Sequence, residues 1–130
     1  MDEVRSYRDL RVWQRGMALA EQVYVLTRLF PADERFGLTS QSRRAAASIP
    51  ANIAEGHGRA TRAAYANFLR IGHGSLKELE THLILASRVG IVSPDVIEPL
   101  LADADVLGRM LQTLIGKLAN PQSQIPKPAP

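Results

Sequence analysis

The sequence predicts an all-α protein built as a four-helix bundle. Ala, Leu and Arg are abundant among its 130 residues, aromatic residues make up only 5%, and no run of β-branched residues occurs, which favours helices. Apolar residues recur at spacings of three and four in four segments separated by short breaks containing Pro or Gly. Short connections imply antiparallel neighbours, so we expect one up-down-up-down domain over residues 1–119. The Pro-rich tail, residues 120–130, is expected to be disordered.

The first expected helix spans residues 7–30, before Pro31, and carries two apolar stripes. The stripe that we assign to the core consists of Leu10, Trp13, Met17, Ala20, Tyr24 and Thr27. The second stripe consists of Val12, Leu19, Val23, Leu26 and Phe30. A bundle helix ordinarily buries a stripe little more than about 100° wide, so the surplus favours contact between copies of the chain. A helix buried centrally in its own bundle is the alternative.

The second expected helix, residues 38–55, carries an ordered track of polar side chains at helical spacing. They are Gln41, Arg44, Ser48, Asn52 and Glu55. Polar groups in such an order suit a buried or shared surface, where each must find a partner. Pro50 lies within this segment and predicts a kink, and the Gly-His-Gly sequence at 56–58 ends the helix.

The third and fourth expected helices follow in the second half of the chain. The third spans residues 61–89, ends at Gly90, and contains Gly72 and Gly74, which predict a close approach of backbones. The fourth opens at Ser93-Pro94-Asp95, with an N-cap, a proline in the first turn and an acid near the helix N-terminus. Apolar residues spaced by three and four then continue to Leu118.

Charge is uneven along the chain. Residues 1–74 carry 11 Arg against 7 acids (+4), whereas residues 75–130 carry 5 Lys and Arg against 6 acids (−1). Thirteen of the 16 cations are Arg, whose planar fork suits phosphate. Their positions on the first three helices predict a nucleic-acid-binding surface, with an ordinary solvated surface as the alternative. The residues expected to contact phosphates are Arg8, Arg11, Arg15, Arg43, Arg44, Arg59, Arg62, Arg70 and Lys77.

Catalytic and metal chemistry finds little support in the sequence. The chain has no cysteine, which excludes a disulfide framework and thiolate ligands. Its histidines, His57, His73 and His82, form no His-Glu-x-x-His or Glu-x-x-His pattern. We therefore expect no enzymatic activity, no cofactor and no metal. No apolar run approaches about 18 residues and the N-terminus lacks an apolar signal core, so we expect a cytoplasmic protein without membrane contact.

Four stretches carry a resemblance to a known family. They are YRDLRVWQ at 7–14, GLTSQ at 37–41, RRAAASIPANIAEG at 43–56 and GSLKELET at 74–81. Through them the chain, over about residues 7–118, resembles the four helix bundle protein family founded on the 23S rRNA intervening-sequence proteins. It is similar also to the accessory variability determinant (Avd) proteins of diversity-generating retroelements. His57 stands where relatives often have an aromatic residue, and Gly72-His73 where they commonly have an Ala followed by a cation.

The resemblance implies an antiparallel protomer, a ring-like homopentamer and suspected RNA binding without established enzymatic activity. Our first hypothesis is therefore a homo-oligomeric RNA-binding accessory protein, whose assembly multiplies a small net charge. The second is an oligomeric protein-interaction adaptor, for example for a reverse transcriptase, which Avd-type relatives engage. In both, the expected subunit interface consists of Leu19, Val23, Leu26, Gln41, Ser48, Asn52 and Glu55.

Overall fold

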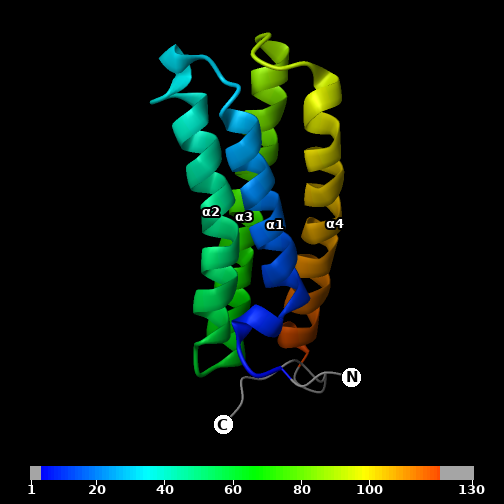
Figure 1. Cartoon of the computed structure of the whole chain (residues 1–130). Helices are drawn as coiled ribbons and strands as arrows, with labels where there is room; N and C mark the ends of the chain where they lie inside the picture. The colour runs from blue at the N-terminus through cyan, green and yellow to red at the C-terminus, as the bar shows by residue number, and fades with distance from the viewer. Residues whose placement is uncertain (1–3, 121–130) are drawn as a thin grey trace.

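The protein is an all-α bundle of four long helices (Figure 1). The computed structural model describes residues 4–120. The helices are α1 (Arg11–Thr27), α2 (Leu38–His57), α3 (Arg62–Arg88) and α4 (Pro94–Ala119), and the two 3₁₀ turns span Tyr7–Asp9 and Ala32–Glu34. Within the described range there is no strand, so the predicted all-α class with four helices is confirmed. The disorder expected for the tail falls, apart from Asn120, on residues outside this range.

Local sequence explains where the helices begin and end. The first helix is shorter than predicted because Ser6 caps a separate 3₁₀ turn in a capping box with Asp9, and Leu10 then takes an extended conformation. Thr61 caps α3 by accepting a hydrogen bond from the backbone N–H of Ala64 at 3.1 Å. Gly90 adopts a φ of 83° in the turn that leads to α4, a conformation that glycine favours.

The core of the bundle takes in the second stripe on α1 and only part of the first, of which Leu10, Ala20 and Thr27 are buried as predicted. Leu19, Val23 and Leu26 are 1%, 0% and 5% exposed and belong to the hydrophobic core of the chain itself. Their expected place in the subunit interface is therefore wrong. Met17, from the stripe assigned to the core, is only half-buried, and Tyr24 is 43% exposed. The apolar surface that α1 leaves uncovered therefore includes Trp13, Met17 and Tyr24 of the stripe assigned to the core.

Two glycines allow α2 and α3 to pack closely. A Cβ on Gly56 would lie 2.7 Å from Cβ of Phe68 on α3, closer than real Cβ atoms approach. A Cβ on Gly72 would lie 3.5 Å from the Ile49 carbonyl oxygen of α2, so this glycine faces the neighbouring helix as predicted. Gly74 has nothing within 4 Å of its Cβ position, so the expected close approach does not occur there. Of these glycines, only Gly56 lies where a Cβ would not fit, because the contact at Gly72 is of ordinary van der Waals length.

Candidate functional site

Arginines gather at one end of the bundle. Figure 1 shows that the start of α1, the connection from α2 to α3 and the end of α4 lie together at this end. Residues 4–15, 55–62 and 117–120 carry only two acids, Asp9 and Glu55, against seven cations. We call these cations the basic end: Arg5, Arg8, Arg11, Arg15, Arg59, Arg62 and Lys117. The opposite end, residues 28–35 and 88–98, carries three cations and four acids.

The cations of the basic end differ in whether they contact an acid or an aromatic ring of the chain. Arg8 lies over the Tyr7 ring, and Arg11 and Arg15 are exposed, with no ion pair to any residue in 4–120. Arg59 pairs with exposed Glu55 at 3.1 Å and lies 4.8 Å from the Phe68 ring centroid. Such exposed pairs are weak, so the Arg59 guanidinium stays accessible to an outside anion.

Arg62 has a structural role at the same end. Its Nη2 donates hydrogen bonds to the carbonyl oxygens of Lys117 and Asn120 at 2.8 Å each, and its Nε donates to that of Leu118 at 3.3 Å. These carbonyls end α4, where the helix dipole is negative and the acceptors lack intrahelical partners. Arg62 therefore ties α3 to the end of α4.

Two other arginines predicted to bind nucleic acid lie away from the basic end and are engaged elsewhere. Arg43 donates to Thr27 Oγ1 at 2.8 Å and lies over the Tyr24 ring, which fastens α2 to α1. Arg44 pairs with Glu78 across to α3. Both lie in the first half of α2, about 20 Å along the helix from His57. The structure does not bring them together with Arg8 and Arg11.

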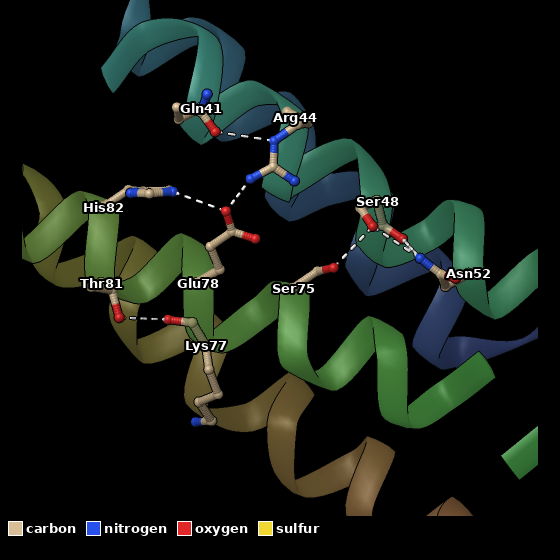
Figure 2. Close-up of polar contacts among 9 residues, drawn as sticks. All are labelled: Gln41, Arg44, Ser48, Asn52, Ser75, Lys77, Glu78, Thr81 and His82. Atoms are coloured by element: carbon tan, nitrogen blue, oxygen red, sulfur yellow. Dashed lines mark hydrogen bonds and ion pairs between the residues drawn. The ribbon is translucent and has the colours of Figure 1, made fainter. Parts of the chain in front are cut away.

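The polar track of α2 finds its partners partly within α2 and partly on α3 (Figure 2). Asn52 Nδ2 donates to the Ser48 carbonyl at 2.8 Å and to Ser48 Oγ at 2.9 Å, and Ser48 Oγ lies 2.9 Å from Ser75 Oγ. Because Ser48 Oγ accepts from Asn52, its own hydrogen is available for Ser75. These half-buried groups are satisfied within the chain, so their expected place at a subunit interface is not needed to explain them.

Charged side chains extend this contact between α2 and α3. Arg44 donates to Gln41 Oε1 at 3.1 Å and to Glu78, whose Oε2 also lies 3.2 Å from His82 Nε2. Partial burial raises the pKa of Glu78, but the hydrogen bonds from His82 and Arg44 outweigh it and leave that pKa below its usual value. Figure 2 shows that Lys77 is directed away from this seam. We call Gln41, Arg44, Ser48, Asn52, Ser75, Glu78 and His82 the α2–α3 seam.

A second surface of α2 is left open by residues 4–120. Together with α1 it forms an open groove of about 580 Å³, bordered by Glu21 and Arg28. We call it the α1–α2 groove; its apolar wall consists of Tyr7, Trp13, Met17, Ala20, Tyr24, Val25, Ala47, Pro50, Ala51 and Ala54. Tyr7 packs edge-on to Trp13, with their ring centroids 5.3 Å apart. Sequence reasoning missed this surface because it placed Trp13, Met17 and Tyr24 in the core.

The three histidines have different surroundings. His57 is buried, and its Nε2 has no hydrogen-bond partner within residues 4–120. Desolvation lowers its pKa, and its ring packs edge-on to that of Tyr65. Burial also lowers the pKa of His73, with a smaller effect of Lys77 in the same direction and an opposing one of Glu80. His82 belongs to the α2–α3 seam. Among residues 4–120, no group of three or more His, Asp and Glu side chains could hold a metal ion.

Comparison with known proteins found a family model and a solved structure that are similar to this chain. A family model described as 23S rRNA-intervening sequence protein matches residues 8–113. The chain is also similar to a protein of unknown function from the S23 ribosomal protein family of Bacteroides thetaiotaomicron, known from a crystal structure. The two share 25% identity over 80% of this chain and 97% of that one, with a TM-score of 0.75. No curated protein matches the chain. In the described part of the chain, none of the helices is long and apolar enough to span a bilayer.

Proposed function

This chain belongs to the 23S rRNA-intervening sequence protein family, and from that premise we propose that it is a non-enzymatic accessory protein that binds RNA in the cytoplasm. The observation that carries the proposal is the basic end, where the start of α1, with Arg8, Arg11 and Arg15, lies at the same end of the bundle as the α2–α3 connection that holds Arg59. Phosphates of a nucleic-acid backbone are densely spaced, and arginine matches them with its planar fork of donors. Binding through such contacts releases counterions and carries little base preference.

The same proposal includes assembly into a ring-like homopentamer of antiparallel bundles. The support is the α1–α2 groove, because an apolar surface that includes Trp13, Met17 and the 43%-exposed Tyr24 is costly to leave in water. A second copy of the chain covers this groove in the proposed assembly. Each copy then adds its basic end to a shared cluster, which raises the local positive potential well above that of one chain with a net charge of +3.

Affinity for RNA as a function of salt tests the proposal. We expect the logarithm of the binding constant to fall linearly with the logarithm of salt concentration, by several orders of magnitude for a site with many phosphate contacts. The double variant Arg8→Gln with Arg11→Gln should lower the slope by about 2, one unit for each lost contact. Arg35→Gln with Arg88→Gln, at the opposite end and outside the α1–α2 groove, removes the same charge and should leave the slope unchanged. Weak binding that ignores salt in every variant would overturn RNA binding.

A second function, an oligomeric adaptor for a protein such as a reverse transcriptase, is favoured by the apolar character of the α1–α2 groove. Reversing the charge of the basic end distinguishes the two functions, because only RNA binding depends on that charge. Arg8→Glu with Arg59→Glu should abolish RNA binding under the first function. Under the second, the same variant should capture a co-expressed reverse transcriptase as well as the wild-type protein does, whereas Trp13→Asp should not.

A further inference from the structure

A groove between α1 and α4 combines an apolar floor with a cationic rim. It holds about 410 Å³ and lies where the start of α1 meets the last turns of α4. Its floor consists of Leu10, Val12, Met110 and Leu114. We call it the α1–α4 groove. It is separate from the α1–α2 groove and shares no lining residue with it.

The rim of the groove carries positive charge that the chain leaves uncompensated. Arg109 pairs with Asp105 at 3.0 Å, whereas neither Arg11 nor Lys117 has an acidic partner within residues 4–120. The negative end of α4, which lies beside Lys117, is already taken by the guanidinium of Arg62. The groove is therefore complementary to an anion with an apolar part that reaches the floor.

The size of the groove favours a single nucleotide over a helical peptide. Ligand sites of roughly 300–1,000 Å³ take small molecules, whereas an amphipathic helix needs anchors over several turns along one continuous groove. An unpaired nucleotide offers a phosphate beside a flat base, and RNA-binding proteins commonly stack such bases on apolar or guanidinium surfaces. Met110 supplies a polarisable, half-buried side chain for that face, and Arg109, whose side chain is 81% exposed, can lie over the base from the solvent side.

We propose that the α1–α4 groove binds one unpaired nucleotide of the RNA, with its base on Met110 and Leu114 and its phosphates at Arg11 and Lys117. This inference rests on the proposed RNA binding and narrows its substrate to RNA with single-stranded segments. A base inside a duplex is stacked between its neighbours and cannot reach the floor. α4, to which the sequence assigned no binding residue, thus contributes half of the site.

Matched RNAs test the inference. Fluorescence anisotropy at one fixed salt concentration compares a single-stranded RNA with a fully paired, loop-free duplex of the same length. Met110→Ser should weaken single-strand binding about five-fold or more and change duplex binding less than about two-fold, because only the unpaired base touches the floor. The control Leu101→Ser changes another half-buried apolar residue of α4 that lies outside the groove, and should leave both affinities unchanged.

Lys117→Gln is a second variant that keeps the test decisive if Met110→Ser fails to fold, because Lys117 is exposed. It should lower the salt slope for the single strand by about 1, and Arg88→Gln should not. If Met110→Ser weakens both RNAs equally, or if Lys117→Gln has no effect, the nucleotide site is wrong while RNA binding stands. If neither RNA binds in a salt-dependent way, RNA binding itself is wrong. If both variants abolish binding of an acidic amphipathic peptide and leave RNA binding unchanged, the groove is a protein site.

Discussion

The two sides of α2 differ in whether other parts of residues 4–120 cover them. Toward α3, Ser48 Oγ lies 2.9 Å from Ser75 Oγ, and Asn52 donates to the carbonyl and Oγ of Ser48 at 2.8 and 2.9 Å. Gly56 lets the two helices pack closely. Along α1, the opposite side borders an open groove with walls of Ala, Pro and aromatic side chains. One side has polar groups with partners, and the other has apolar groups without them.

The contrast shows that polarity alone does not locate an interaction surface. The polar track on α2 needed partners, and the same protomer supplies them: Arg44 and Ser48 find theirs on α3, and Asn52 bonds to Ser48 within α2. The α1–α2 groove, in contrast, stays open, because nothing in residues 4–120 covers its apolar side chains. Changes in the α2–α3 seam should therefore affect the stability of the protomer, and changes in the α1–α2 groove should affect its assembly.

The largest effect is expected for a charge placed in the groove. Met17→Asp puts a carboxylate on the surface that a second copy would cover, and burying an unpaired charge costs several kcal/mol. We expect the assembly to weaken by about 100-fold or more, since about 1.4 kcal/mol corresponds to ten-fold. Light scattering should show the mass falling to that of one 14.3 kDa chain, with helical circular dichroism retained.

Ala102→Asp is the matched control for that variant, because it adds the same charge at an exposed position of α4 outside the groove. Its mass should equal that of the wild type. A wild-type protein that is already monomeric at micromolar concentration would contradict the role of the groove in assembly.

The next effect in size concerns the contact between α2 and α3. Gly56→Ala forces a Cβ to within 2.7 Å of Phe68 Cβ and 3.2 Å of the Tyr65 carbonyl oxygen, both close to the rigid backbone. Overpacking of this kind should lower the free energy of unfolding by about 2 kcal/mol, measured by urea denaturation. Gly74→Ala meets nothing within 4 Å and should instead raise it by up to about 1 kcal/mol. Equal effects of the two variants would refute the tight seam.

A smaller effect is expected for the hydrogen bonds of the seam. Ser48→Ala and Ser75→Ala each remove one side of the 2.9 Å contact, and a double-mutant cycle isolates the coupling between them. We expect a coupling of about 1 kcal/mol, typical of a half-buried neutral hydrogen bond. Because Ser48→Ala also deprives Asn52 of an acceptor, it should destabilise more than Ser75→Ala. Purely additive effects would mean that the contact adds no stability.

Sequence reasoning succeeded where the local signal was strong. Four helices were predictable because apolar spacing, Gly90 and the Ser93-Pro94 start act within a few residues. The choice between the two stripes on α1 was not predictable, because Leu19 and Met17 belong to patterns of equal period. The structure buries the stripe of Val, Leu and Phe30 and leaves Trp13 and Tyr24, whose polar atoms suit a boundary with water, at the groove.

At the candidate site, sequence reasoning also failed where a side chain has its partner far along the chain. The sequence indicated that Arg44 and Ser48 needed partners, but Glu78 and Ser75 lie 34 and 27 positions further along the chain. Likewise, Arg8 and Arg62 look alike as exposed-helix arginines. Only the fold shows that Arg62 faces the carbonyl end of α4, and that Lys117 of α4 joins the basic end.

The smallest expected effect is the response of the seam to acid. The pKa of Glu78 is lower in the folded chain than its ordinary value of 4.5, because hydrogen bonds from His82 and Arg44 favour the carboxylate more than partial burial disfavours it. The unfolded chain therefore binds the proton more readily, so the stabilisation is fully present above pH 4.5 and disappears as the pH falls through the folded-state pKa. Glu78→Gln should be less stable than the wild type at pH 7, and the difference should shrink below pH 4.5, as urea denaturation at each pH would measure. Because the Glu78 side chain is 37% exposed, solvent keeps the difference small, and a difference that grew on acidification would mean that the charge of Glu78 opposes folding.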